Sequence, residues 1–405
     1  MDSVTIKALR RAWVHSTGLG GSGDSARAAM TEAGWLHATA GVDPYLSIRS
    51  RYSAVEKGGV DALLADDTVR IVTAARGSRM LVPDYQSDLA LSLSLLVTGR
   101  EMDLDRRKLE VSDVEIERAA SNVIALLKEE PLSSREIRKK VPEGTVRSLG
   151  PVGKKMGYPS TLPMVMSHLE YGGKIGLWAE GDRLDNERYR WDLLDIEVEV
   201  SRDCQSVVRR SIAHYLDFAG ASTIADFAAW SGVEKRDSKE GFESLDLHPF
   251  KVDGLDVVVY ANQTTAEFLL GGVPRVPKAV IVPFREPFID YRDGYSLLLD
   301  SEHHHFKSRA WGNGKKNLVE VNNSGLRSIL VEGAIGGFWE YDEETQEIQY
   351  ALFNQMRGGD LRNLEADLEE VAMWLFNTFG HAKVNQLDSM GVRKARLDCI
   401  LSMKP

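Results

Sequence analysis

The chain has 405 residues, of which 43% are hydrophobic and 27% charged, and its formal net charge is −10. This composition is typical of a soluble globular protein, and the length allows two to four domains with a sizeable core. The sequence contains no apolar run near the roughly 20 residues that a membrane-spanning helix needs. Its two cysteines, Cys204 and Cys399, are too few for a disulfide framework or a cysteine-bound metal cluster. Since the first residues also lack a signal-peptide pattern, we expect a cytoplasmic protein without a membrane partner.

A glycine-rich run occupies residues 18–23. It lacks the Gly-Lys-Ser/Thr ending of a phosphate-binding loop and a preceding strand pattern, so it predicts a flexible loop. A helix is expected over 24–33, with Asp24 or Ser25 as its N-cap.

Two polar side chains, His37 and Thr39, stand two residues apart in the next segment. Glycines at 34 and 41 argue against a helix over 36–42, and in an extended chain residues two apart share a face. His37 and Thr39 could then point to one place, where an imidazole and a hydroxyl can hold and activate a water. The alternative is that His37 packs at a seam between domains. The following helix is expected over 44–51, with Asp43 as its cap and Pro44 as its first residue.

Arg76, Gly77 and Ser78 form the next distinctive segment. A glycine permits a close approach of the backbone to a neighbour, and an arginine can bind a phosphate or a carboxylate. Arg76 is therefore either a DNA-facing residue or part of a buried structural pair.

The segment from 113 to 192 predicts helices followed by a β-hairpin, which is the plan of a winged helix. A helix is expected over 113–128, with an apolar stripe through Val114, Ile116, Ala119, Ala120, Val123, Ile124 and Leu127. A short helix over 135–140, capped by Ser133 or Ser134, and a longer one over 161–170 follow. Two wing strands are expected over 174–178 and 189–192.

Basic residues gather within this segment despite the acidic balance of the whole chain. Between 135 and 155 there are seven basic residues against two acidic ones, and the basic set includes Lys139, Lys140, Lys154 and Lys155. Such a run can contact DNA phosphates, or it can be a solvated helix face.

The same plan recurs further along the chain. Helices are expected over 207–218, over 223–230 with Ser222 as cap and Gly232 as the stop, and over 238–245, before strands at 252 and 257–260. From about 275 the pattern changes to short strands, at 279–282, 317–321, 328–331, 336–341 and 347–353, with a closing helix over 364–379 that includes Phe376 in its apolar face. The adjacent histidines His303, His304 and His305 lack a second ligand pair at metal-binding spacing.

Several motifs occur in the order in which a known family carries them. They are Leu36-His37-Ala38-Thr39, Tyr45-Leu46-Ser47-Ile48, Ser50-Arg51, Arg76-Gly77-Ser78-Arg79-Met80-Leu81-Val82-Pro83, Tyr215-Leu216 with Ala225–Gly232, Asp290-Tyr291-Arg292-Asp293, Leu299-Asp300, Glu302-His303-His304 and Asn313-Gly314. Together they resemble the winged-helix DNA glycosylases of the AlkZ/YcaQ type over most of the chain.

The resemblance implies an α+β protein with three tandem winged-helix units and a small C-terminal antiparallel β-barrel. The expected boundaries are 1–112 for the first unit, 113–200 for the second, 201–272 for the third and 273–405 for the barrel and closing helix. Asp290, Arg292 and Asp293 are expected to be structural partners that tie the barrel to a winged helix.

The implied activity is that of a monofunctional DNA glycosylase, which hydrolyses the N-glycosidic bond of an alkylated purine such as an N7-alkylguanine. His37 would orient the attacking water or take its proton, with Thr39 as the second hydrogen-bond partner. Arg76, Ser78, Arg51 and the four lysines would contact double-stranded DNA. The resemblance implies no metal and no organic cofactor, and a monomer that associates with the nucleoid.

The sequence departs from the family pattern at its centre. The family reads Leu-Gln-x-Gln or Leu-Gln-x-Asp at the first motif, whereas this chain has His37 and Thr39; the Asp-Pro that follows in the family is Ala40-Gly41; and the histidine after Arg-Gly-Thr is Met80. A catalytically inactive DNA-binding regulator and a protein-interaction scaffold are therefore alternative functions.

Overall fold

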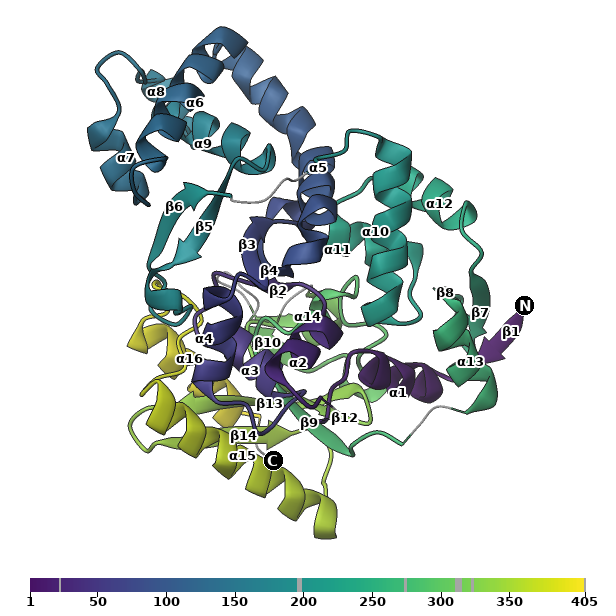
Figure 1. The fold of residues 1–405 in the computed structure, drawn as a ribbon. Coiled ribbons are helices and arrows are strands. Elements are labelled where there is room, and N and C mark those ends of the chain that lie inside the picture. Colours follow the sequence, from purple (N-terminus) through teal and green to yellow (C-terminus); the bar gives the residue numbers. More distant parts are fainter. Residues whose placement is uncertain (22, 195–198, 273–274, 310–314, 322–323, 404–405) are drawn as a thin grey trace.

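The computed structural model describes residues 1–405 except 22, 195–198, 273–274, 310–314, 322–323 and 404–405, and its fold is mixed α+β (Figure 1). Within the described residues, no helix is both long and apolar enough to cross a membrane.

Residues up to 112 form helices around a short β-hairpin. The elements are β1 (Asp2–Val4), α1 (Ile6–Ser16), α2 (Ala26–Ala33), β2 (Leu36–His37), α3 (Asp43–Arg49), α4 (Lys57–Ala65), β3 (Val69–Thr73), η1 (Ala75–Gly77), β4 (Arg79–Pro83), η2 (Asp84–Gln86) and α5 (Ser87–Lys108). The Ser25 hydroxyl caps α2 by accepting from the Ala28 N–H at 3.2 Å, as the sequence predicts. The predicted cap of α3 is wrong, because Asp43 is its first residue and accepts instead from the Arg285 backbone N–H at 3.1 Å.

The next part has four helices and a second hairpin. These are α6 (Asp113–Leu127), α7 (Ser134–Lys140), α8 (Gly150–Lys155), α9 (Leu162–Tyr171), β5 (Ile175–Ala179), η3 (Glu180–Asp182) and β6 (Tyr189–Leu193). Ser133 and Glu136 form a reciprocal capping box at the start of α7. Val114, which was expected in the apolar stripe of α6, is 79% exposed, because the buried face of this helix begins at Ile116.

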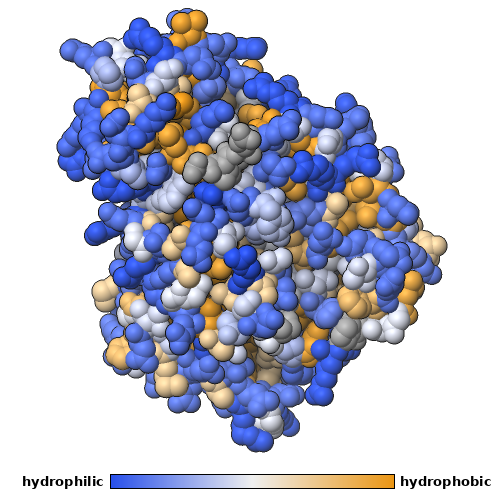
Figure 2. Space-filling model, in the orientation of Figure 1, coloured by the Kyte–Doolittle hydropathy of each residue, from blue (hydrophilic) through white to orange (hydrophobic). Residues whose placement is uncertain are grey.

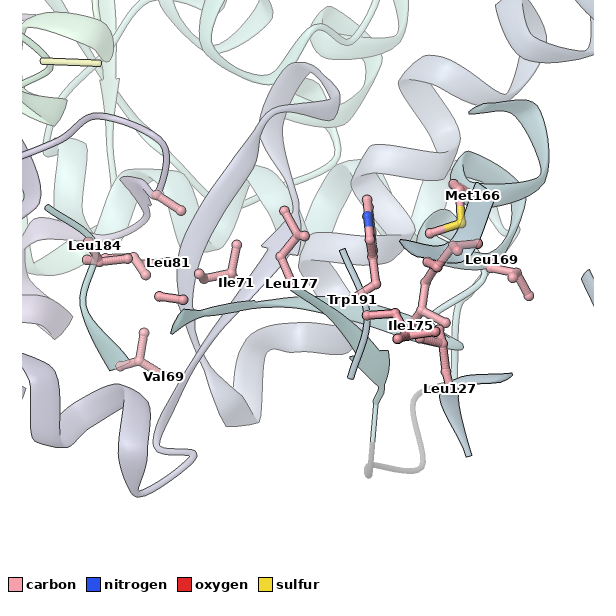
Figure 3. Packing of buried hydrophobic residues seen from close by; sticks show 14 of the residues in the cluster. Val69, Ile71, Leu81, Leu127, Met166, Leu169, Ile175, Leu177, Leu184 and Trp191 are labelled. Carbon is pink, nitrogen blue, oxygen red and sulfur yellow. The ribbon is translucent and has the colours of Figure 1, made fainter. Parts of the chain in front are cut away.

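The two hairpins join into one antiparallel sheet with strand order β2-β4-β3-β5-β6. Ile71 of β3 pairs with Leu177 of β5 at the junction. One hydrophobic cluster continues across this junction, as Figure 3 shows. It runs from Val69, Ile71, Leu81 and Leu184 through Leu177 to Ile175, Trp191, Leu127, Met166 and Leu169.

The following part again places helices before a hairpin. Its elements are α10 (Cys204–Ala219), α11 (Ile224–Ser231), α12 (Lys235–Glu243), β7 (His248–Val252), β8 (Val258–Ala261) and α13 (Gln263–Gly271). Strand β1 pairs with β7 in parallel, so the sheet order is β1-β7-β8. Gly232 ends α11 in the left-handed region at φ 82°, as expected, but the cap is Thr223 rather than Ser222.

The C-terminal part is an open sheet rather than the predicted barrel. Its elements are β9 (Ala279–Val282), α14 (Pro287–Asp290), η4 (Ser301–His303), β10 (Lys307–Arg309), β11 (Lys315–Asn317), η5 (Leu318–Glu320), β12 (Arg327–Val331), β13 (Ala334–Asp342), β14 (Glu347–Leu352), α15 (Gly358–Thr378) and α16 (Met390–Leu401). Among the described residues the main sheet has the order β14-β13-β12-β9, with its first and last strands unpaired to each other, and β10 and β11 form a separate hairpin.

Both faces of this sheet are covered by other parts of the chain. Ile329, Trp339 and Tyr341 pack in one cluster with Leu368 and Leu375 of α15. The side chains that alternate with these, Leu330 and Phe338, pack together with Val282 of β9 in another cluster. That cluster includes Ile400 of α16 and Leu9 of α1.

Three smaller expectations in this part also differ. Phe376 of α15 is 46% exposed because the buried face of that helix runs through Leu368 and Leu375. The strand predicted over 317–321 is mostly the 3-10 turn η5. The predicted Asn313-Gly314 motif lies outside the described residues.

Candidate active site

His37 lies at the end of β2, paired with Met80 of β4. Its neighbours Leu36 and Ala38 are 1% and 0% exposed and belong to the same core cluster. The His37 side chain is 13% exposed, and Thr39 is exposed. Burial therefore alternates from Leu36 to Thr39, while β2 ends at His37 and the backbone bends at residues 38–40.

The imidazole of His37 meets a carboxylate from the other end of the chain. Its Nε2 lies 3.1 Å from Oδ2 of Asp290, the last residue of α14. The sequence predicted only that Asp290 ties the C-terminal part to a winged helix. It did not predict that Asp290 is the hydrogen-bond partner of His37. No local pattern could reveal it, since 253 positions separate the two residues.

The backbone around Asp290 is fixed on both sides by buried contacts. Glu286, the cap of α14, accepts from Arg51 Nη2 at 2.7 Å and from the Ser47 hydroxyl at 2.9 Å. On the other side, the Tyr291 hydroxyl donates to the Ala33 carbonyl, just before β2. Asp290 is therefore held in register with the strand that carries His37.

The residues that follow bind the third helical part, as expected. Arg292 donates to the Ser222 hydroxyl at 2.9 Å and to the Ala219 carbonyl at 2.5 Å. The backbone N–H of Asp293 donates to Asp226 at 2.8 Å. Of the predicted tying residues, Arg292 and the Asp293 backbone make these contacts, whereas Asp290 turns to His37.

The charge of the Asp290 carboxyl group determines which ring nitrogen of His37 carries a hydrogen. Burial raises the pKa of Asp290, but its hydrogen bond and electrostatic interaction with His37, together with the positive charges of Arg285 and Arg76, outweigh burial and hold this pKa below its ordinary value. A carboxylate that is ionised can only accept, so Nε2 of His37 must carry the hydrogen in this contact. In the neutral imidazole, Nδ1 is then the atom with a free lone pair.

Asp290 is expected to make the stability of the fold depend on pH at the acidic end. A carboxyl group whose pKa is lowered by folding stabilises the native state above its unfolded pKa of about 3.9, and this contribution disappears as pH falls through the folded pKa. The difference in unfolding free energy between wild type and Asp290→Asn should therefore be constant near neutrality and shrink below about pH 4. Chemical denaturation at a series of pH values measures it; a difference that grows toward acid would contradict the assignment.

Arg76 and Ser78 occupy the turn between β3 and β4. Arg76 is exposed, lies in the left-handed region at φ 56°, and its Nη1 is 3.4 Å from the Ala229 carbonyl. Ser78 closes the turn through its own backbone, donating to Ala75 at 3.0 Å. The close approach permitted by Gly77 is to the protein itself, since a Cβ there would be 2.5 Å from Thr98 Cγ2. Arg76 therefore remains accessible, with its charge acting on Asp290.

The expectation that Arg51 contacts DNA is wrong. Its side chain is 0% exposed. Its guanidinium donates to the carbonyls of Thr17 and Ser47 at 2.7 and 2.8 Å as well as to Glu286. A buried guanidinium with these partners stabilises α3 against α14 and cannot meet a phosphate.

The four predicted lysines are exposed but distant from His37. Lys139 and Lys140 end α7, and Lys154 and Lys155 end α8. Figure 1 shows both helices at the outer end of the second part, well separated from β2 and α14. Lys140 pairs with Glu130, whereas the other three form no salt bridge with any described residue.

The histidines at 303–305 lie on the turn after η4. His303 is buried and lies against Phe353, with ring centroids 4.9 Å apart. Within the part of the chain that the structure describes, no three His, Cys, Asp or Glu side chains are grouped so that they could hold a metal ion.

The fold matches that of a known DNA repair enzyme. The Streptomyces sahachiroi DNA glycosylase AlkZ superposes with a TM-score of 0.70 over 95% of this chain and 99% of its own, at 16% sequence identity. At that identity the likeness concerns the fold. The sequence itself matches the family described as DNA glycosylase AlkZ-like over residues 30–374, and the chain belongs to that family. A comparison with curated proteins gave no match.

Proposed function

We propose that this protein is a monofunctional DNA glycosylase that releases an alkylated purine, such as an N7-alkylguanine, from double-stranded DNA. The observation that carries the proposal is the hydrogen bond between His37 and Asp290. It places an oriented imidazole at the position of the family's first motif, where the glutamine of the usual motif is absent. Membership of the AlkZ-like DNA glycosylase family supports the reaction class.

The reaction needs a water near C1′ of the damaged nucleotide. Alkylation at N7 makes the purine cationic, so the bond from C1′ to N9 breaks with its electron pair moving to N9 and neutralising the base. The water oxygen bonds to C1′, and its proton passes to Nδ1 of His37, whose lone pair is free because Nε2–H is held by Asp290. The Asp290 carboxylate then stabilises the imidazolium.

Thr39 is proposed as the second partner of the water. It is exposed beside His37 and follows a buried alanine, so its hydroxyl lies on the solvent side of the motif. A hydroxyl both donates and accepts, which allows it to orient the water without removing its proton.

The helices are proposed to bind DNA as winged-helix units. The order α6, α7, α9 and then the β5–β6 hairpin supports a winged helix over 113–200, and α10 to β8 supports one over 201–272. The accessible Arg76 would contact a phosphate near the reaction centre, with Ser78 beside it on the turn.

Lys139, Lys154 and Lys155 are the lysines whose charge is available for phosphates. Lys139→Ala should flatten the dependence of log affinity on log salt by about one unit, the expectation for one lost phosphate contact. Lys140→Ala should flatten it less, because Lys140 is already paired with Glu130. Titrations of an undamaged duplex at several salt concentrations measure the slopes; equal slopes for wild type and Lys139→Ala would assign this lysine to solvent.

The test of the function is a base-release assay on a duplex with one N7-alkylguanine. Free alkylguanine and a strand with an abasic site, cleaved by hot alkali, are expected in single-turnover conditions. A panel of alkyl groups from methyl to bulky adducts separates a narrow from a broad substrate range. Binding to DNA without release from any member of the panel would favour the DNA-binding regulator.

A further inference from the structure

One leucine projects from the surface close to the candidate active site. Leu387 is 88% exposed, more than any other large apolar side chain among the described residues, and Met390 nearby is 64% exposed. A single exposed apolar residue is common on protein surfaces. Leu387 differs in two respects: hydrogen bonds fix the backbone of its turn, and that turn contacts the segment after Thr39.

Buried charged residues hold the turn that carries Leu387 against α16. Both Asp388 carboxylate oxygens accept from Arg396 of α16 at 2.9 Å, and one also accepts from the Val384 N–H at 3.1 Å. Arg396 is in turn paired with Glu340 of β13. The Leu387 N–H donates to the Asn385 side chain at 2.9 Å. These hydrogen bonds hold the backbone of the turn in a conformation that leaves the Leu387 side chain exposed.

Contacts connect this turn directly to the segment after His37 and Thr39. The Val42 N–H donates to the Lys383 carbonyl at 3.1 Å. Gln386 Nε2 donates to the Glu187 carbonyl at 2.7 Å, and the Glu187 carboxylate accepts from the backbone N–H groups of both Gly41 and Gln386. In Figure 1 the chain before α16 lies against the turn between β5 and β6. Leu387 therefore follows a residue that Glu187 connects to Gly41, two positions after Thr39.

We propose that Leu387 is a wedge that inserts from the minor groove beside the damaged base pair and partly unstacks it. This inference rests on the proposed function, because it assumes that DNA lies across His37. Apolar side chains such as leucine serve this purpose in proteins that kink DNA, where a buried methyl surface compensates for lost stacking. The wedge would expose C1′ to the water on His37 without full flipping of the base.

Charge beside the leucine agrees with a DNA partner. Lys383 is exposed and forms no salt bridge with another described residue, so it can take a phosphate on the flank of the wedge. The acid next to Leu387, Asp388, is 4% exposed and neutralised by Arg396. The turn lies beyond residues 30–374, the part of the chain that matches the family.

The test uses a duplex that holds a tetrahydrofuran abasic-site analogue with 2-aminopurine next to it, since unstacking raises 2-aminopurine fluorescence. Wild type should raise the fluorescence, and Leu387→Ala should lose most of that rise and bind this duplex about tenfold more weakly, the loss expected for a leucine side chain that no longer becomes buried. Leu387→Met should retain the rise. Lys383→Ala should retain it too while flattening the salt slope by about one unit.

Leu270→Ala is the matched control, because Leu270 is a leucine of α13 that is 59% exposed and lies across the molecule from the turn. It should match wild type in fluorescence and affinity. The wedge is overturned if wild type binds without a rise, if Leu387→Ala gives the wild-type rise, or if wild type does not bind the duplex. Base release by the same preparations separates the two ideas: a Leu387-dependent rise without release would remove the glycosylase and keep the wedge, and release without such a rise would do the reverse.

Discussion

His37→Ala is expected to lower the rate of base release about 10²- to 10⁴-fold, the usual contribution of a general base. The cause is the loss of Nδ1, the acceptor that Asp290 leaves free by holding Nε2–H at 3.1 Å. Single-turnover release of an N7-alkylguanine from a duplex measures the rate, with DNA affinity measured in parallel. The His37 side chain is largely buried at the end of β2, so His37→Ala leaves unfilled space there. His37→Gln is the variant to compare, because it fills more of that space and restores the family's usual amide.

The dyad predicts a pattern across further variants. Asp290→Asn should lower the rate less than His37→Ala, and the double variant should be no slower than His37→Ala alone, because Asp290 acts through the imidazole and such effects are not additive. Thr39→Val keeps the shape and removes the hydroxyl, so it should cause a smaller loss. If His37→Ala releases base at the wild-type rate, His37 has no catalytic role, although the fold and the family stand.

Glu286→Ala is expected to lower the free energy of unfolding by about 3–5 kcal/mol, the range for breaking a buried ion pair from one side. Arg51 and Glu286 are both 0% exposed, so the variant leaves the Arg51 guanidinium buried with only two carbonyl partners, Ser47 on α3 and Thr17 at the end of α1. Chemical denaturation measures the loss. Base release should also fall, because Glu286 caps the helix whose last residue is Asp290.

A surface pair provides the control for that prediction. Glu130→Ala removes the partner of Lys140, and both side chains are about half exposed, so the change should cost less than about 1 kcal/mol. Glu286→Gln keeps an acceptor for the Ser47 hydroxyl and should lie between the two. Equal stability of Glu286→Ala and Glu130→Ala would show that the Arg51 side chain finds water when its partner is removed.

Local signals were enough to predict many helix ends. Ser25, Ser133 and Gly232 act through hydrogen bonds or backbone angles within a few residues, and the sequence predicts them correctly. The alternation expected for His37 and Thr39 is seen in the burial of this segment, where Ala38 is buried and Thr39 is exposed, while their action on one water stays a prediction. The family resemblance, carried by several short motifs in order, predicted the family that residues 30–374 match.

The failures concern burial that depends on distant residues. Arg51 was expected to contact DNA from the family resemblance, and only the fold reveals that Glu286, the cap of α14, is its buried partner. The barrel was expected from the family resemblance, and the helix α16, which packs on one face of the sheet, was not predicted. Two of the three buried residues of α16 are Arg393 and Arg396, so its buried face carries charge and leaves no apolar stripe to find.

The sheet that joins the first two parts makes them a single folding unit. A chain ending after α5 would lack β5, so β3 would become an unprotected edge strand and its side of the shared core would face water. The helices that carry the exposed lysines are consequently not an independent domain on a flexible linker, because they share a hydrophobic core with the strands next to β2. Under the proposed function, DNA bound at α7 or α8 would therefore contact helices that are connected to β2, the strand of His37, through one continuous sheet.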